Sequence, residues 1–265
     1  MKHYLWPVNP PFDILNRFFD RIYVLTIPAA AQRQEALAQA MQGLNIRFFY
    51  GIEKQTIRLD RLQQEGVYDE NLTRRYQRYG KSMTTGEVAC AMGHRNIYED
   101  IVANGVQKAL IFEDDVFPLA DNLAYVPAMF ATIPPDWDVL FFDYHKHEKP
   151  VPLKRTVYHV QHAMGLLKWN HTMIGNLFPK PVNDHWKTAG FHDFADAYAV
   201  THAAAKKLAA LQTPVSAVAD NLLARAVTQK QLNGYVSVPK LFAQRSEGQY
   251  KSIDTLVDKP LRKEW

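Results

Sequence analysis

The pattern that most constrains the fold is a strand, a helix and a second strand in succession near the start of the chain. RIYVLTI (21–27) is rich in β-branched and aromatic residues, as buried strands are. Residues 29–44 predict a helix with Leu37 and Met41 on one side, and IRFFYGI (46–52) predicts a second strand. Strand, helix and strand in this order form a βαβ unit. We therefore expect an α/β fold with a parallel sheet.

Strand and helix patterns continue to alternate along the rest of the chain. TTGEVACAMGHRNIYEDIVANG predicts a helix that begins with a capping box of Thr84 and Glu87. KALIF (108–112) is expected to form a central strand, whereas residues 53–83 should form a loop with short helical pieces and residues 144–192 should be irregular. The other expected elements are helices over 121–133, 201–212 and 217–229, and strands over 137–142, 197–200 and 234–238.

The charge and the cysteine content restrict the classes of protein to consider. A formal net charge of +4 favours an anionic ligand or an anionic membrane face, but it is too small to indicate nucleic-acid binding. Cys90 is the one cysteine, so no internal disulfide can form, which is compatible with a reducing compartment. The first residues, MKHYLWPVNPPFDIL, lack the apolar core of a signal peptide. We expect a cytoplasmic protein, and peripheral binding to the inner face of the membrane is compatible with these features.

Three carboxylates follow the expected central strand directly, in KALIFEDDVFP (108–118). Two carboxylates about 4 Å apart repel each other by roughly 4 kcal/mol at an effective dielectric constant near 20. Ligands of open α/β sheets bind at the carboxyl ends of the strands, where this cluster is expected. Side chains alternate along an extended segment, so Glu113 and Asp115 can share a face and hold a hard divalent cation. The alternative is a solvated strand end, or caps on the next turn.

These segments resemble glycosyltransferase family 25. The resemblance covers about residues 21–253, and it is carried in order by IYVLTI…R, GEVACAMGHRNIY, LIFEDDV, AYAVTHAAAKKL, DNLL and a late Q…S-I pattern. It implies a single-domain GT-A fold. The implied activity is transfer of a hexose, usually galactose, with inversion from a UDP-sugar to a saccharide acceptor such as a lipooligosaccharide precursor. The implied parts are an N-terminal extension (1–20), a nucleotide-sugar-binding half (21–143), an acceptor-side half (144–245) and a C-terminal tail (246–265).

The resemblance also implies how the donor and a metal ion are held. Asp115 is expected to be the first ligand of Mn²⁺ or Mg²⁺, and Glu113 either a second ligand or a contact to the ribose. The residues expected around the UDP-sugar are Thr26, Arg33, Gly86, His94, Glu113, Asp114, Gln244 and Ser252. Structural alternatives remain for three of them, because Arg33 is equally typical of a helix surface, His94 of a hydrogen-bonded core and Gly86 of a plain turn.

Inverting transfer needs a base that takes the proton of the acceptor hydroxyl. Asp220, in VADNLL, matches the aspartate of the family and is the first candidate. Asp196 and Asp193, in FHDFADAY, are the alternatives, and each of the three carboxylates could instead be a helix cap or a structural group.

Two other functions compete with glycosyl transfer. A metal-dependent hydrolase could use the same carboxylates with His145 and His147 of DYHKHE, although a catalytic zinc site usually takes three well-spaced protein ligands. A non-catalytic nucleotide-sugar-binding protein is the second alternative. It is suggested by Thr26-Ile27-Pro28-Ala29, which stands where the family commonly has Asn-Leu-Asp/Arg-Arg. Gly93, which precedes the helix histidine where serine is usual, is a second departure from the family pattern and bears on the donor base and sugar.

Overall fold

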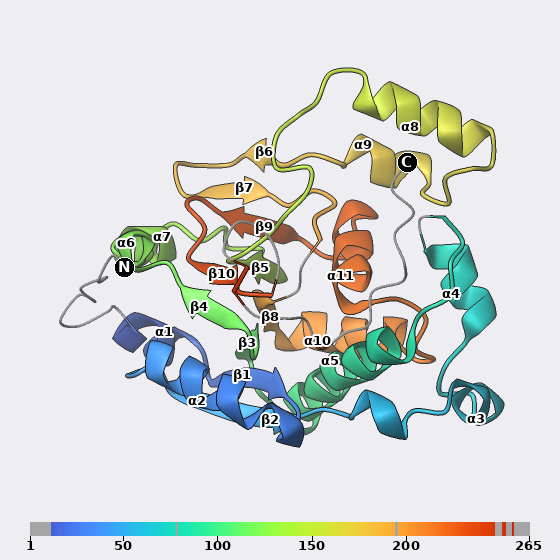
Figure 1. The fold of residues 1–265 in the computed structure, drawn as a ribbon. Coiled ribbons are helices and arrows are strands. Elements are labelled where there is room, and N and C mark those ends of the chain that lie inside the picture. Colours follow the sequence, from blue (N-terminus) through green and yellow to red (C-terminus); the bar gives the residue numbers. More distant parts are fainter. Residues whose placement is uncertain (1–11, 78, 194–195, 247–250, 253–255, 257–265) are drawn as a thin grey trace.

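The computed structural model describes residues 12–77, 79–193, 196–246, 251–252 and 256 (Figure 1). The strands are β1 (Arg21–Thr26), β2 (Ile46–Tyr50), β3 (Lys108–Glu113), β4 (Val116–Pro118), β5 (Val139–Phe141), β6 (Lys180–Pro181), β7 (Trp186–Thr188), β8 (Ala197–Thr201), β9 (Gly234–Ser237) and β10 (Phe242–Gln244). The α-helices are α1 (Phe12–Phe18), α2 (Ala31–Ala40), α3 (Leu59–Gln64), α4 (Glu70–Tyr76), α5 (Thr85–Ala103), α6 (Ala120–Leu123), α7 (Val126–Ala131), α8 (Lys154–Ala163), α9 (His171–Gly175), α10 (His202–Leu211) and α11 (Ala219–Thr228). Two 3₁₀ helices, η1 (Pro28–Ala30) and η2 (Lys54–Thr56), complete the described elements.

The central sheet has eight strands in the order β2-β1-β3-β8-β5-β9-β7-β6. β1 pairs in parallel with both β2 and β3, as the βαβ pattern predicts, and β5 pairs in parallel with β9. β8 lies antiparallel between β3 and β5, so strands from both expected halves of the chain share one sheet. The prediction of a GT-A-like α/β fold in one domain is confirmed.

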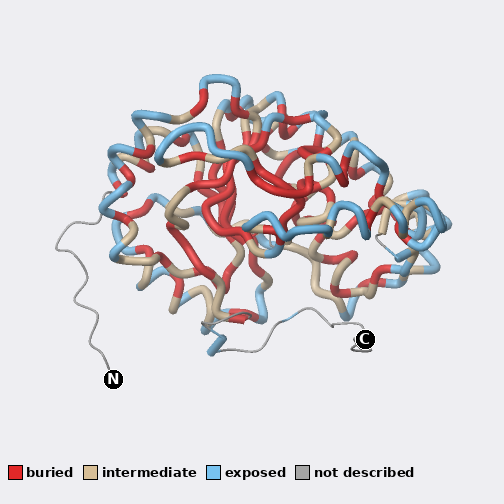
Figure 2. Tube along the Cα trace, turned by 90° about the horizontal axis from the view of Figure 1, so that it is seen from above, coloured by how far each residue is buried: buried red, intermediate tan, exposed pale blue. Residues whose placement is uncertain are grey.

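Helices cover both faces of the sheet, because successive residues of each buried strand point to opposite sides. On one face, Tyr23 and Ile111 pack with Ile97 of α5 and Leu208 of α10. On the other face, the neighbouring strand residues pack with α1, α2 and α7. Figure 2 shows the buried stretches gathered in the middle of the molecule and the exposed ones around it.

Two expected segments differ from the structure. Residues 144–192 were expected to be irregular, but they contain α8, α9, β6 and β7. The single helix expected over 121–133 is divided into α6 and α7, and Pro127 stands in the first turn of α7, where its missing N–H costs no helical hydrogen bond.

None of the helices in the described part of the chain is both long and apolar enough to cross a membrane.

The direction of β8 determines which residues meet at the functional edge of the sheet. Because β8 is antiparallel to β3 and β5, its first residue lies at the edge where those two strands end. The backbone N–H of Glu113, at the end of β3, donates a hydrogen bond to the carbonyl of Asp196 at 2.9 Å. Asp143, which follows β5, reaches the same edge, since its N–H lies 3.4 Å from the carbonyl of Ala197. Carboxylates from three separate segments are thereby brought together.

Candidate active site

A cleft of about 380 Å³ opens at the carboxyl ends of β1 and β3. This volume lies in the range of small-molecule sites. Seven of the residues expected around a donor or metal line it: Thr26, Arg33, Gly86, Glu113, Asp114, Asp115 and Gln244. The topology thus brings together segments that are far apart in the sequence, as a binding site at this edge requires.

Asp114 is held by partners from the first βαβ unit. Its carboxylate accepts hydrogen bonds from the Thr26 hydroxyl at 2.7 Å and from Arg33 Nη1 at 3.0 Å. Burial raises the pKa of Asp114, and these two partners only partly oppose the rise. Arg33 therefore has a defined position in the cleft wall, where its Nη1 also lies 3.8 Å from an oxygen of Asp115.

Asp115 is nearly enclosed, with 5% of its surface exposed. Its Oδ2 accepts a hydrogen bond from Gln244 Nε2 at 3.2 Å, because β10 pairs with β4 and brings Gln244 opposite Val116. Its Oδ1 is buried and makes no hydrogen bond of ordinary geometry with a described residue, although the Ser246 hydroxyl interacts with this carboxyl group and opposes the rise of its pKa. Burial, followed by the charge of Glu113, raises the pKa of Asp115 to about 7. A buried oxygen of this kind suits a cation ligand.

Glu113 faces two side chains of α5. Its Oε1 lies 3.2 Å from His94 Nε2 and 3.9 Å from Cys90 Sγ. The ligand atoms of Cys90, His94 and Glu113 all lie within 4.8 Å of one another, and they form the one group of three metal-ligating residues found in the described part of the chain. Cys90 had no predicted role, although its spacing of four residues from His94 could have indicated one. Burial raises the pKa of the Cys90 thiol well above its usual value.

His94 itself is a core residue with 1% exposure, and it does not line the cleft. Its Nδ1 lies 2.8 Å from the hydroxyl of Tyr198, which lies 2.8 Å from the hydroxyl of Tyr98. His94 is therefore a hydrogen-bonded core residue, as the structural alternative predicts. His94 can still act on a ligand through Glu113, which it contacts at the cleft.

The start of α5 is fixed by its cap and by a close approach to β1. Thr84 accepts a hydrogen bond from the Glu87 N–H, and the Glu87 carboxylate accepts one from the Thr84 N–H at 2.7 Å, which confirms the predicted capping box. A Cβ atom at Gly93 would lie 2.9 Å from a methyl group of Leu25. A glycine there permits the close packing that brings Gly86 to the cleft.

Asp143 and Asp196 form a buried acidic pair beside the cleft. Both oxygens of Asp196 are enclosed, and its carboxyl group interacts with that of Asp143. Burial, then the charge of Asp143, raises the pKa of Asp196 well above its usual value. Burial acts in the same direction on Asp143, but His145 and Lys240 outweigh it, so the pKa of Asp143 is lowered. The enclosed, raised-pKa carboxyl of Asp196 is less readily ionised than an ordinary aspartate, which makes it a weaker candidate for the general base.

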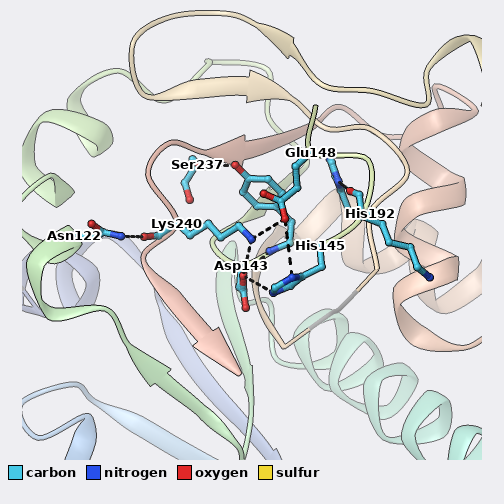
Figure 3. Close-up of polar contacts among 9 residues, drawn as sticks. Asn122, Asp143, His145, Glu148, His192, Ser237 and Lys240 are labelled. Carbon is cyan, nitrogen blue, oxygen red and sulfur yellow. Dashed lines mark hydrogen bonds and ion pairs between the residues drawn. The ribbon is translucent and has the colours of Figure 1, made fainter. Parts of the chain in front are cut away.

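Figure 3 shows Lys240 and His145 beside Asp143. His145 Nε2 lies 3.4 Å and Lys240 Nζ 3.6 Å from its Oδ1, and Lys240 also contacts Glu148 at 3.1 Å. His147 lies elsewhere: its Nδ1 is 2.7 Å from the Phe191 carbonyl, and aromatic rings surround it. Because His145 and His147 have different partners, the geometry does not support the two-histidine metal site of a hydrolase.

The remaining predicted residues lie around the cleft or outside it. Asp220 is half-buried in the first turn of α11, and its charge contributes to the raised pKa of Glu87 and Cys90 on α5. Asp193 forms an ion pair with Lys146 and a β-bridge with His145. Ser252 is exposed, does not line the cleft, and donates its backbone N–H to the Arg245 carbonyl. Most of the expected tail, 246–265, lies outside the described residues.

Comparisons with known proteins identify the family of the chain. The model of glycosyltransferase family 25 (LPS biosynthesis protein) matches residues 19–223. A probable inactive glycosyltransferase 25 family member 3 from Rattus norvegicus is 30% identical over 112 residues, which are 41% of this chain and 19% of that protein. Procollagen galactosyltransferase 1 from Danio rerio is 22% identical over 105 residues, 37% of this chain and 16% of that protein. The chain thus spans less than a fifth of the length of these relatives. The family match covers most of the chain, which therefore belongs to glycosyltransferase family 25.

Proposed function

We propose that the chain transfers a hexose, galactose in the first instance, with inversion from a UDP-sugar to a saccharide acceptor such as a lipooligosaccharide precursor. Family membership supports glycosyl transfer in general, and one relative is named a galactosyltransferase. The observation that carries the proposal is the buried Oδ1 of Asp115 in a cleft that Arg33 and the start of α5 also line. A cytoplasmic location remains part of the same prediction.

The residues of the cleft fit a nucleoside diphosphate and a hard divalent cation. Arg33 offers a guanidinium, and the N-terminal turn of α5 at Gly86 offers backbone N–H groups, which both bind phosphate. Asp115 Oδ1, Glu113 and the buried Gln244 Oε1 would supply oxygen ligands, the set that Mn²⁺ and Mg²⁺ prefer. When bound, such an ion stabilises the negative charge that develops on the departing diphosphate.

A second donor set competes for Glu113. Cys90, His94 and Glu113 offer sulfur, nitrogen and oxygen, which suit Zn²⁺ better than Mn²⁺ or Mg²⁺. The raised pKa of Cys90 disfavours the thiolate that a metal requires. We therefore assign the proposed ion to the oxygen set, and substitutions on the two sides of Glu113 distinguish the alternatives.

Two groups remain for the proton of the acceptor hydroxyl. Asp220 stays the first candidate, because it is half-buried near α5 and its usual role in the family is implied by the DNLL match. His145 is the second, because the lowered pKa of Asp143 keeps a carboxylate beside a partly exposed imidazole. A carboxylate that orients a histidine is a common arrangement for general bases.

Binding and turnover can be tested separately. The thermal unfolding temperature of the purified chain should rise when UDP-galactose and Mn²⁺ are added together. Asp115→Asn should lose the metal-dependent part of this rise. Asp184→Asn, which changes an exposed carboxylate, is the matched control. An unchanged shift in Asp115→Asn, or a shift lost only in Cys90→Ser, would overturn the assignment of the ion.

Turnover is measured as UDP release in the presence of saccharide acceptors. Asp220→Asn should abolish release while UDP-galactose still binds, and His145→Gln should do so instead if the imidazole is the base. Metal-dependent binding of UDP-galactose without release of UDP on any acceptor would support the non-catalytic alternative. Several relatives are named as inactive members of the family, which favours this alternative.

A further inference from the structure

Exposed apolar side chains are concentrated in and around α8. Eleven large apolar residues are exposed in the described part of the chain, and six of them lie between residues 151 and 166. These six are Val151, Leu153, Val157, Val160, Met164 and Leu166. Single exposed apolar residues need no explanation, but a contiguous group on one short segment indicates a contact surface.

Two of these residues lie within α8, and two stand at its ends. Val157 and Val160 are three residues apart on one side of the helix, Leu153 is its N-cap in the left-handed conformation, and Met164 is its C-cap. Together the four form an exposed apolar stripe. Their exposed fractions run from 49% for Val157 to 76% for Leu153. The opposite side of α8 carries the buried Tyr158. The apolar stripe therefore faces outward, the reverse of an ordinary surface helix.

Packing beneath α8 keeps the stripe outside. Tyr158 belongs to an aromatic cluster with Trp169, Met173 of α9 and Ala224 of α11. The Nδ1 atoms of His159 and His171 lie 2.9 Å apart, which joins α8 to the start of α9. In Figure 1, α8 lies at the periphery, next to α9 and away from the central sheet. The stripe cannot turn inward without breaking this cluster.

The charge of the surrounding segment identifies the kind of surface that α8 fits. Residues 149–183 contain no Asp or Glu, and their lysines and arginines are Lys149, Lys154, Arg155, Lys168 and Lys180. The segment therefore carries a formal charge of +5, more than the +4 of the whole chain. Opposite charge favours an anionic partner. A second copy of the chain, joined through α8 around a two-fold axis, would place two such segments against each other.

We propose that residues 149–168, with α8 at their centre, dock on an anionic lipid surface. The apolar stripe enters the boundary between headgroups and acyl chains, and the flanking cations lie at the headgroups. This arrangement is typical of interfacial amphipathic helices. The proposal does not rest on the proposed function, because vesicle binding needs neither a sugar nucleotide nor turnover.

Sedimentation with vesicles tests the apolar stripe. Wild-type chain should pellet with vesicles of phosphatidylcholine and phosphatidylglycerol. Combined Val157→Gln, Val160→Gln and Met164→Gln should weaken the partitioning by about tenfold or more, since each side chain loses burial in the acyl boundary. Glutamine is a good helix former, so α8 should remain folded. The matched control, which replaces three exposed apolar residues elsewhere, combines Tyr50→Gln, Tyr125→Gln and Val182→Gln.

The same assay tests the cations. Lys149→Gln with Lys168→Gln, both on exposed side chains, should weaken binding on the order of fivefold for each cation removed, and only on anionic vesicles. Lys206→Gln with Lys207→Gln, an exposed pair on α10, should bind like wild type. Absence of wild-type pelleting, or equal losses in the control variants, would overturn the proposal. A dimer in analytical ultracentrifugation that the triple α8 variant dissociates, without vesicle binding, would show instead that the stripe is a self-interface.

Discussion

Protonation of His192 should destabilise the fold as the pH falls from neutral. The ring is 3% exposed, and both nitrogens are occupied in the neutral form. Nε2 accepts the backbone N–H of Gly190 at 2.9 Å, and Nδ1 lies 2.8 Å from the Lys146 carbonyl, to which it donates. A second proton on Nε2 would point at the N–H of Gly190. Burial, the largest cause, lowers the pKa of His192 to about 4.

The pKa sets the size and the pH range of the effect. The unfolded chain binds this proton near pH 6.5, whereas the folded chain does so only near pH 4, so acid favours the unfolded state between these values. At about 1.4 kcal/mol per pH unit, the free energy of unfolding should fall by about 3 kcal/mol over the interval. The contribution is fully present above pH 6.5, and the loss is complete below pH 4.

Urea unfolding at several pH values between 7 and 4 measures the effect. His192→Gln keeps an acceptor but cannot be protonated. It should cost stability at pH 7, where the imidazole makes both of its hydrogen bonds. The difference between wild type and variant should then shrink by about 3 kcal/mol toward pH 4. His185→Gln, on a half-exposed ring, should give a profile parallel to that of wild type. A constant difference between wild type and His192→Gln across the pH range would refute the reasoning.

Three substitutions test the packing around the cleft and its scaffold, each by urea or thermal unfolding. Gly190→Ala places a Cβ atom 2.4 Å from the backbone carbonyl of Leu177 and should cost about 3 kcal/mol or fail to fold, whereas Gly175→Ala meets nothing within 4 Å and should be neutral or slightly stabilising. Thr84→Ala removes the cap of α5 and should cost about 1 kcal/mol, with Thr84→Ser as the conservative control. Arg33→Ala leaves a buried carboxylate without its cation and should cost about 2 kcal/mol or more. A loss below 0.5 kcal/mol there, on the order of an exposed ion pair, would contradict this account.

The elements that could be predicted are those whose residues show a clear local period. The strands at 21–26 and 108–113 contain the continuous apolar runs 22–25 and 109–112, and α5 has both a capping box and a helical stripe. The segment 144–192 could not be assigned in this way. Its longest helix, α8, has an outward apolar face, so the usual rule for the buried side of a helix does not apply to it.

The position of the site was predicted better than its composition. Glu113, Asp114 and Asp115 are adjacent in the sequence, so the end of one strand brings them to the cleft together. Asp143 and Asp196 join this edge only because β8 runs antiparallel between β3 and β5, a feature of topology that no local pattern contains. The sequence therefore shows the acidic motif and offers Asp196 as a candidate base, but it does not show that Asp143 and Asp196 lie together behind that motif.

The balance of charge explains which carboxylates are suited to a metal ion. Asp114 pairs with Arg33 at 3.0 Å, Asp143 lies 3.4 Å from His145 and 3.6 Å from Lys240, and burial raises the pKa of Asp196 well above its usual value. Arg33 Nη1 lies 3.8 Å from the carboxylate of Asp115, farther than from that of Asp114. The other oxygen of Asp115 is enclosed, so it suits a cation ligand. Glu113 contacts a histidine and a protonated thiol. The negative charge without a close cationic partner thus lies on these last two residues, the pair to which the proposed ion is assigned. Deleting Arg33 would extend that excess to Asp114, so Arg33→Ala should strengthen metal binding while it weakens the hold on the nucleotide.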